Sequence, residues 1–432
     1  MGVDASDPVG AAPDAFGTRR GMHLRPSMSL AVAAALAVAL VTGGCGPTEE
    51  PPASTEPTWH GDIHPIIEAR CGGCHMQGGI APFALSTFEQ AQTHALAIAD
   101  AVVQRRMPPW MPSDDCQSFH GSRRMPQEEI DKIARWVALD SPEGSPPAAP
   151  PAPAKLPSLA WVDAEVSAGE DYLPPEGASD DYRCLIAETG VTSSRDLIGF
   201  EILPGSTRTV HHVILYAMDR EEAQQRDSAE AGLGYTCFGG PGGSPRMVGA
   251  WAPGSGAVVL PRSTGMTLYS DDVLVMQVHY NLSSAREPDR TKVALQFAQQ
   301  PRPLKGHMFP LPADDFRLAP RSTDQSTTLE YEVPLPITLW GVMPHMHLLG
   351  RSIRLEVERA GGEEACLIDI PKWQFHWQQS YFYTDLRGIP LNEGDRVRLT
   401  CTWDNPTDRE ITWGEGTADE MCLMLIYVTS GG

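Results

Sequence analysis

The stretch TVHHVILY, residues 209–216, is rich in β-branched and aliphatic residues and predicts a β-strand that carries two adjacent histidines. Further runs of the same character are separated by Gly, Pro and Asp turns; they are Val273–Val278, Lys292–Phe297, Ile353–Val357, Arg396–Thr402 and Leu423–Val428. No Gly-rich nucleotide loop or long helix interrupts them. The last ~270 residues therefore predict antiparallel β-sandwich structure in two domains.

The composition sets limits on the fold and on the partners. A chain of 432 residues exceeds one hydrophobic core and fits two to four domains. Its 39 prolines and 40 glycines, with 41% hydrophobic residues, favour β-rich domains with many turns. A formal net charge of -22 without a basic stripe repels phosphate backbones, so we expect no nucleic-acid partner.

The N-terminus is typical of an export signal. Arginines precede the apolar run Leu30–Val41, which is too short to span a bilayer comfortably. The stretch TGGCG at residues 42–46 resembles a bacterial lipobox in which Cys45 becomes lipidated, although Thr42 stands where Leu is usual, so ordinary signal cleavage is the alternative. We expect residues 1–45 to be a lipoprotein-type signal peptide and the protein to be exported, to the bacterial periplasm or as an outer-membrane lipoprotein tethered through Cys45.

Two proline-rich stretches, Pro47–Pro57 and Pro142–Pro157, divide the mature chain. Helical patterns lie between them, at Ile63–Arg70, Thr87–Gln104 and Gln127–Val137. The expected organisation is a linker at 46–58, a small all-α domain at 59–141, a Pro-rich linker at 142–165, and sandwiches at 166–303 and 304–432.

The motif CGGCH, residues 71–75, predicts that the small domain carries heme. In such a motif Cys71 and Cys74 add to the heme vinyl groups, and His75 becomes an axial ligand of the iron. A zinc knuckle or a disulfide turn is the alternative for a pattern of five residues. Export and the flanking helices favour covalent heme c.

The segment around this motif resembles the class I-like cytochrome c domains of bacterial multidomain proteins. The resemblance rests on GGIAPFAL after the motif and on MPPW at residues 107–110. It implies that Met107 is the sixth ligand of the heme iron. Other candidates lie close by in the sequence, and they are Met111, Met125 and His120.

Six soft-metal ligands lie in the strand region: His211, His212, His279, His345, His347 and Met421. A histidine triplet and a His/His/thioether triplet suit two copper ions, because imidazole binds Cu(II) and Cu(I) and a thioether favours Cu(I). His345 and His347 would project from one face of an extended strand. His211 and His212 would point to opposite faces unless they sit at a strand start or a bulge; otherwise one is buried and hydrogen-bonded while the other faces solvent.

Five segments occur in the order and approximate spacing of the copper type II, ascorbate-dependent monooxygenases, which this chain resembles over roughly residues 175 to 430. They are TVHHVILY, VGAWAPGSGAVVLP, VLVMQVHYN, HMHLLG and TADEMC. The resemblance implies two jelly-roll-like sandwiches, each with one copper, facing across a solvent cleft. It implies that His211, His212 and His279 hold the electron-storing copper and that His345, His347 and Met421 hold the oxygen-binding copper as the catalytic site.

The cysteines outside the signal and CGGCH are even in number: Cys116, Cys184, Cys237, Cys366, Cys401 and Cys422. In an exported protein they indicate disulfides, and six cysteines allow fifteen pairings. The family resemblance implies the pairs Cys184–Cys237 and Cys401–Cys422. Cys116 and Cys366 have no counterpart there, and they are either free or a link between the heme domain and the sandwiches.

The chain departs from the peptide-amidating relatives where those proteins hold a substrate carboxylate. The corresponding positions are Met343, Leu423 and Leu425, so a peptidylglycine substrate is not expected. We expect an apolar pocket near the second copper, with neighbours drawn from Met346, Met424 and Tyr427.

Together these features predict an exported copper monooxygenase that hydroxylates a C–H bond of a small organic substrate with O2. The resemblance implies that O2 binds at the Met-ligated copper and that the second electron comes from the histidine-only copper. The reductant is expected to be ascorbate, a periplasmic redox protein or the chain's own heme. A non-catalytic copper and heme protein, acting in electron transfer or as a sensor, is the alternative.

Overall fold

The computed structural model describes residues 56–77, 81–146, 158–252, 255–283, 285–414, 416 and 418–430. The expected signal peptide, its Cys45, residues 46–55 of the first linker and residues 147–157 of the second lie outside these residues. Within them, no helix is both long and apolar enough to cross a membrane.

The described residues up to 146 are helical. The elements are a π-helix (Trp59–Ile63), α1 (His64–Arg70), α2 (Phe88–Thr93), α3 (Ala95–Val103) and α4 (Gln127–Ala138). The single helix expected over Thr87–Gln104 is wrong in one respect, because it is divided at His94, whose backbone leaves the helical region. The His94 ring instead stacks on Phe83, with ring centres 4.0 Å apart.

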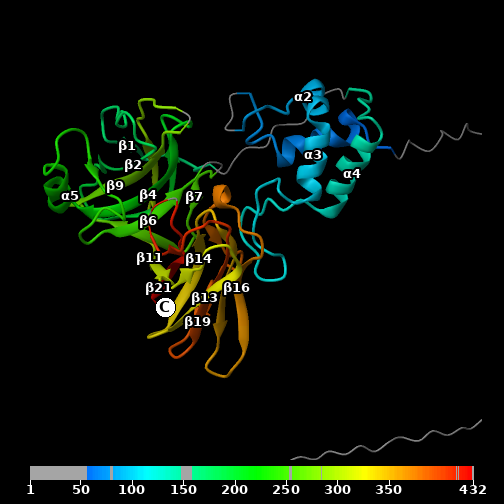
Figure 1. Ribbon diagram of the computed structural model, residues 1–432. Helices are drawn as coiled ribbons and strands as arrows, with labels where there is room; N and C mark the ends of the chain where they lie inside the picture. Colours follow the sequence, from blue (N-terminus) through cyan, green and yellow to red (C-terminus); the bar gives the residue numbers. More distant parts are fainter. Residues whose placement is uncertain are drawn as a thin grey trace, which may run out of the picture. The chain divides into compact units, whose positions relative to one another are not determined.

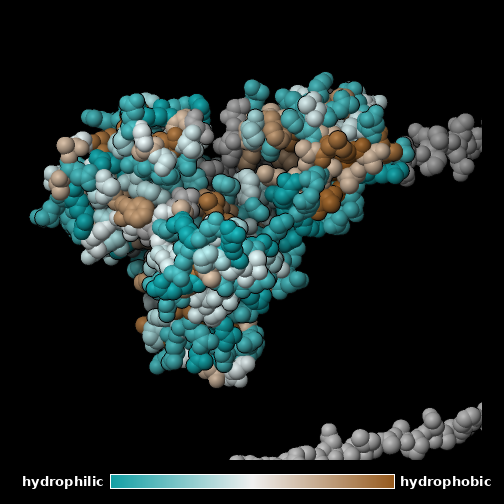
Figure 2. All heavy atoms as spheres, in the orientation of Figure 1, coloured by the Kyte–Doolittle hydropathy of each residue, from teal (hydrophilic) through white to brown (hydrophobic). Residues whose placement is uncertain are grey.

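These helices share one hydrophobic core, which does not bury all of their apolar side chains. Trp59 and Trp136 are fully buried at its centre, and α3 and α4 lie side by side (Figure 1). Leu96 and Val103 of α3 remain exposed, and Figure 2 shows hydrophobic atoms gathered over this part of the molecule. A domain of this size has too little interior to bury every apolar side chain.

The first sandwich packs a five-stranded sheet, in the order β5-β2-β9-β4-β6, against β1, β10, β3, β8 and β7. The strands are β1 (Ala164–Ser167), β2 (Asp180–Glu188), β3 (Arg195–Leu203), β4 (Val210–Asp219), β5 (Tyr235–Thr236), β6 (Arg246–Trp251), β7 (Val258–Val259), β8 (Thr264–Leu268), β9 (Asp272–Asn281) and β10 (Lys292–Phe297). A short helix, α5 (Arg220–Asp227), follows β4 and was not expected, because only its Ala223 is buried and the sequence shows no amphipathic pattern there.

The second sandwich packs the sheet β13-β19-β15-β16 against β11, β21, β14, β17 and β18. The strands are β11 (Leu304–Pro312), β12 (Arg317–Leu318), β13 (Ser322–Glu332), β14 (Ile337–His345), β15 (Gly350–Glu358), β16 (Glu364–Ile370), β17 (Tyr381–Phe382), β18 (Ile389–Leu391), β19 (Arg396–Asn405), β20 (Ile411–Thr412) and β21 (Leu423–Ser430). A 3-10 turn, η2 (Phe375–Trp377), precedes β17. All six strands expected from the sequence are present.

One sheet runs through both sandwiches. The start of β11 pairs in parallel with β8, Leu304 opposite Thr264, and so completes a ten-stranded sheet. The hydroxyl of Tyr427 on β21 donates to Thr264 Oγ1 at 2.9 Å, and Trp340 of β14 packs in the first sandwich's core. The two expected sandwiches therefore share backbone pairing and core.

Residues 110–120 fall in the expected range of the small helical domain but pack on the second sandwich. Met111 and Phe119 belong to that sandwich's hydrophobic core. The Ser113 amide donates to the Asp369 carbonyl at 2.7 Å, and Cys116 forms a disulfide with Cys366. This segment therefore attaches the helical part to β16 and the residues that follow it.

Candidate metal centre and cavity

All six predicted metal-binding side chains line one cavity of about 720 Å³. His211, His212 and His279 come from the first sandwich, and His345, His347 and Met421 come from the second. This volume lies in the range of small-molecule sites. The structure thus brings together residues that are widely separated in the sequence.

His211 and His212 reach the same cavity because β4 begins with a bulge. Val210 pairs with Tyr280 and His212 pairs with His279, so His211 is the extra residue between two paired positions. A bulge breaks the strict alternation of side chains along a strand. The sequence analysis required a strand start or a bulge for His211 and His212 to share one metal, and the structure has a bulge there.

The ring nitrogens of this histidine triplet converge. One nitrogen from each of His211, His212 and His279 lies within 4.8 Å of the others, and Nδ1 of His211 lies 3.3 Å from Nδ1 of His212. Within the described part of the chain, no other three His, Cys or acidic side chains meet this spacing. Three converging imidazoles suit one copper ion.

Two residues of β2 orient His279. Its Nε2 donates to the Asp180 carboxylate at 2.8 Å, and its ring stacks on Tyr182, with ring centres 4.2 Å apart. Its Nδ1 is buried and has no partner, which is costly for a polar atom. A metal ion held by the triplet would satisfy this nitrogen, so the residues present fit the ion that the family implies.

Burial keeps these imidazoles neutral near pH 7, which is the form that binds metal. It lowers the pKa of His211 to about 4 and holds the pKa of His212 well below its ordinary value. Burial also lowers the pKa of His279, against the opposing effect of Asp180.

The second group forms where β14 ends at His345. Nδ1 of His345 donates to Gln378 Oε1 at 2.5 Å, and Nδ1 of His347 donates to the Asp419 carbonyl at 3.0 Å. The two ring centres are 5.1 Å apart, and because the printed contacts engage Nδ1 of each ring, Nε2 is the nitrogen that would bind a metal. Met421, which is buried, lines the cavity with them.

Glu420, which directly precedes Met421, holds the backbone at and after His347. The sequence analysis missed this residue. Its fully buried carboxylate accepts the amide N–H of His347 at 3.1 Å, the amide N–H of Leu349 at 2.6 Å and Nε1–H of Trp403 at 2.9 Å. Burial raises the pKa of Glu420 to about 7. The only signal in the sequence is an acidic residue directly before Met421.

Phe375, also missed, lies between the two histidine groups. Its ring stacks on His211, with centres 5.4 Å apart, and meets His347 edge-on at 6.1 Å. Because both distances run to the Phe375 ring centre, the ring centres of His211 and His347 lie no further apart than the sum of the two. The Phe375 ring thus contacts one histidine of each group.

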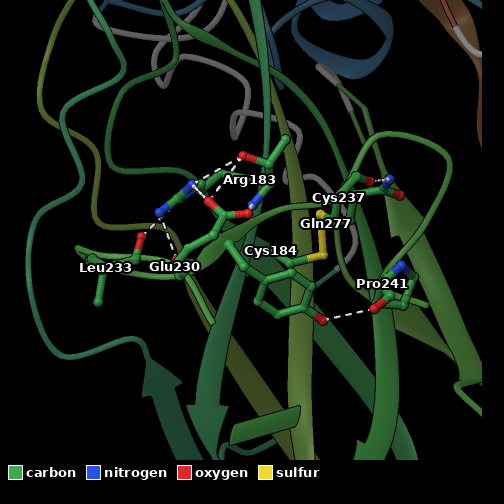
Figure 3. Close-up of a disulfide and its surroundings, with 10 residues drawn as sticks. Arg183, Cys184, Glu230, Leu233, Cys237, Pro241 and Gln277 are labelled. Carbon is green, nitrogen blue, oxygen red and sulfur yellow. Dashed lines mark hydrogen bonds and ion pairs between the residues drawn. A yellow bond between two sulfur atoms is a disulfide. The ribbon is translucent and has the colours of Figure 1, made fainter. Parts of the chain in front are cut away.

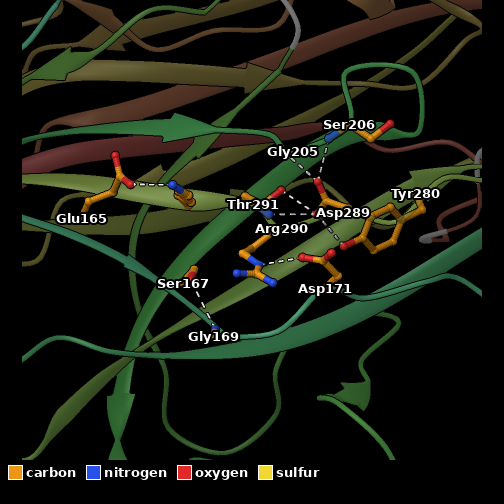
Figure 4. A network of polar contacts seen from close by, with 11 residues as sticks. Glu165, Ser167, Gly169, Asp171, Gly205, Ser206, Tyr280, Asp289, Arg290 and Thr291 are labelled. Atoms are coloured by element: carbon orange, nitrogen blue, oxygen red, sulfur yellow. Dashed lines mark hydrogen bonds and ion pairs between the residues drawn. The ribbon is translucent and has the colours of Figure 1, made fainter.

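Asp289 is the shared acceptor of a network that joins the turn before β4 to a side chain of β9 (Figure 4). Its buried carboxylate accepts the amides of Gly205 and Ser206, at 2.8 and 2.9 Å, in the turn before β4. It also accepts the hydroxyl of Tyr280 at 2.9 Å and both the amide and the hydroxyl of Thr291. Tyr280 is the neighbour of His279, so one carboxylate ties β4 to β9 beside the site.

Three disulfides join the six described cysteines outside the CGGCH motif. Cys184–Cys237 and Cys401–Cys422 are the pairs that the resemblance implied, and Cys116–Cys366 spans 250 positions of the sequence. Figure 3 shows the first of them, with Gln277 Nε2 donating to the Cys237 carbonyl at 2.8 Å. Disulfides persist in oxidising compartments, so the three bridges indicate an exported protein.

The apolar neighbours expected at the second group are wrong. Met346, Met424 and Tyr427 are fully buried in the sandwich cores, and they do not line the cavity. Successive side chains of a strand point to opposite faces. Met424 therefore faces the core, while its neighbours on β21, Leu423 and Leu425, face the cavity together with Met343.

The CGGCH residues, for which the sequence analysis predicted a covalent heme, directly follow α1. Cys71 and Cys74 are free thiols. His75 donates from Nδ1 to the Phe83 carbonyl at 3.0 Å, which leaves Nε2 available for iron. Burial raises the pKa of the Cys71 thiol to about 12.

The four candidates for the sixth heme ligand lie in different surroundings. Met111 is buried in the second sandwich, and its sulfur accepts the Gln374 amide at 3.3 Å. His120 is exposed, and Met125 is buried in the helical core. Met107 is half-buried and belongs to no hydrophobic core.

Comparison with known proteins agrees with this geometry. Residues 314–429 match the copper type II ascorbate-dependent monooxygenase, C-terminal domain. DBH-like monooxygenase protein 1 of Homo sapiens is 25% identical over 254 residues, 52% of this chain and 40% of that protein. The protein of the same name from Mus musculus is 32% identical over 98 residues, 22% of this chain and 16% of that protein. This chain thus spans well under two thirds of these relatives' length. The matches support the copper type II monooxygenase family of oxidoreductases for the β-sheet part of this chain.

Proposed function

We propose that this protein is an exported copper-dependent monooxygenase that hydroxylates a C–H bond of a small organic substrate. The observation that carries the proposal is the convergence of two ligand groups on one cavity. The reaction consumes O2, two electrons and two protons. One oxygen atom is inserted into the C–H bond, and the other leaves as water.

Each ligand group has a distinct role in this proposal. His211, His212 and His279 hold an electron-storing copper, and His345, His347 and Met421 hold the copper at which the substrate reacts. When bound, the two copper ions supply one-electron redox steps and O2 activation. The protein fixes the ligands: Asp180 orients His279, and Gln378 orients His345.

The surroundings of the second group exclude water from its inner side. His347 and Met421 are both buried. The amide of Gln378 is itself fixed, because its Nε2 donates to the Phe375 carbonyl at 2.8 Å. Ligands held in this way need little rearrangement during the reaction. The cavity beside them distinguishes a catalytic site from a closed structural one.

Electrons come from ascorbate or a periplasmic redox protein, or from a heme c on Cys71 and Cys74, with His75 and Met107 as axial ligands. The segment that follows Met107 supports the heme as donor. Met111 accepts the backbone amide of Gln374, and the next residue, Phe375, contacts both histidine groups. This chain of contacts gives a short route from the helical part to the cavity.

The location proposed for the protein is the bacterial periplasm or the outer membrane, with a possible tether through a lipidated Cys45. The three disulfides support an oxidising compartment. Mass spectrometry of protein from a bacterial membrane fraction should detect an N-terminal diacylglyceryl cysteine. A mature N-terminus without lipid would contradict the tether.

Substrate-dependent O2 uptake by the copper-loaded protein tests the function. Two copper ions per chain, one hydroxylated product per O2 and no uptake after copper removal are expected. Copper binding with no uptake across a broad substrate panel would favour an electron carrier or sensor instead.

The heme is tested separately: Met107→Ala in the full chain should convert a low-spin heme spectrum to a high-spin or differently ligated one, and zinc without heme would end the cytochrome proposal.

A further inference from the structure

The cavity wall next to the second ligand group is apolar. Buried Ala250, Met343 and Leu425 form a cluster against which four half-buried side chains pack: Ile214, Met247, Met308 and Leu423. All seven line the cavity. Leu423 pairs with His345, and Leu425 pairs with Met343, so the apolar wall begins beside the ligands of the second group.

The wall lacks a free charge. Among the described residues that line the cavity there is no Asp or Glu, and Arg246 is the one permanent cation. Arg246 is already neutralised, because it forms an ion pair with buried Asp272 and donates to the Thr267 carbonyl at 2.8 Å. Its guanidinium also lies 4.9 Å from the ring centre of Tyr269.

Amide and hydroxyl side chains of the wall are committed to protein partners. Gln277 donates to the Cys237 carbonyl, Gln378 holds His345 and the Phe375 carbonyl, and the hydroxyl of Thr267 donates to Asp196 at 2.9 Å. A charged group on a ligand would therefore lose its water without gaining an oppositely charged partner. That loss costs several kcal/mol in a buried site.

Aromatic side chains complete the lining. Trp251, Trp377 and Trp413 face the cavity together with Phe375. Flat rings of this kind offer a large apolar contact area to an alkyl or aryl group.

We propose that the substrate is a neutral, largely apolar molecule, an alkyl or aryl compound with no carboxylate and no ammonium group. The inference rests on the proposed function and names the substrate class for the same cavity. The apolar body lies against Met343 and Leu425, and the C–H bond that reacts lies at the Met421 end of the wall. The cavity volume of about 720 Å³ accommodates a molecule of this kind.

Binding to copper-free protein tests the substrate class independently of any turnover. The probes are 4-phenyl-1-butanol, 4-phenylbutylamine and 4-phenylbutyrate, which share one apolar body and differ in charge. Calorimetry and the fluorescence of the lining tryptophans report binding. We expect the neutral probe to bind at least about tenfold tighter than either charged one. Equal or tighter binding of an ion would overturn the inference, and so would a failure of the neutral probe to bind.

A single introduced charge should change the preference. Met343→Arg should strengthen binding of 4-phenylbutyrate at least about tenfold and weaken binding of the amine, whereas Met343→Leu should keep the wild-type order. Met308→Arg offers the same test from β11 if the first variant does not fold. Unchanged selectivity in folded arginine variants would place the ligand outside this wall. Copper content and O2 uptake of the wild type, measured separately, show whether the proposed function stands.

Discussion

Asp180 and His279 form the contact that sets the geometry of the histidine triplet: the carboxylate accepts Nε2–H at 2.8 Å, and the unpartnered Nδ1 remains for a metal. Asp180→Ala should lower copper affinity at the triplet by about 10- to 100-fold, as loss of a supporting carboxylate does. Competitive chelator titration with Cu(II) EPR measures this. Glu165→Ala, which removes an exposed ion pair with Lys292, should leave the affinity unchanged. Wild-type affinity in Asp180→Ala would show that the carboxylate does not support the ion.

Met421→Ile should abolish hydroxylation and weaken the second copper, because the thioether is lost from that group alone. The heme spectrum and the triplet copper should be unchanged. Metal analysis and O2 uptake are the measurements, and Met424→Leu, a volume-conserving change in the core, is the control. Turnover at the wild-type rate in Met421→Ile would remove the sulfur from the reaction.

Glu420→Ala should destabilise the copper-free protein by about 3 kcal/mol or more, because three buried N–H groups lose their acceptor. It should also loosen His347 and Met421, so copper at the second group should be lost first. Urea unfolding and copper stoichiometry test both effects. Glu410→Ala removes an exposed ion pair of the same sandwich and should change stability by less than about 0.5 kcal/mol. A similar, small effect of both substitutions would contradict the anchoring role.

Asp289→Ala should cost about 3 kcal/mol or more of folding free energy, since five donors converge on this carboxylate. Asp171→Ala, which breaks only an exposed ion pair with Arg290, is the control visible in the same view (Figure 4). Denaturant unfolding compares the two variants. Equal midpoints for both would mean that the network does not stabilise the turn before β4.

Heme reduced in the copper-loaded full chain should reoxidise in a first-order process whose rate is independent of protein concentration. In the proposed function the heme iron would give one electron to Cu(II), and the contact of Met111 with Gln374 and the Cys116–Cys366 bridge would keep donor and acceptor together. Stopped-flow absorbance at several protein concentrations measures this rate. Phe375→Leu should slow the transfer while heme and copper contents stay constant. Heme that stays reduced while copper turns over with ascorbate would give the cytochrome another role.

Local patterns were enough to predict six of the strands, and the family resemblance gave the candidate metal ligands, which stay a prediction. The β-branched runs predicted β4, β9 and β21, because alternation and turn residues act over a few neighbours. The order of His, His and Met segments predicted which side chains meet at the cavity. The division of the helix at His94 was not predicted, and the contact that His94 makes there, stacking on Phe83, is not readable from the local pattern.

The sequence by itself determined six of the strands, the candidate metal ligands and the even number of cysteines left for disulfides. Only the tertiary structure decided how these parts support one another: the bulge at His211, the carboxylates of Asp180, Asp289 and Glu420, and the ring of Phe375 between the two groups. The physical reason is that a buried carboxylate or ring acts through partners far away in the chain. Its type alone does not reveal which backbone amides or imidazoles the fold will place around it.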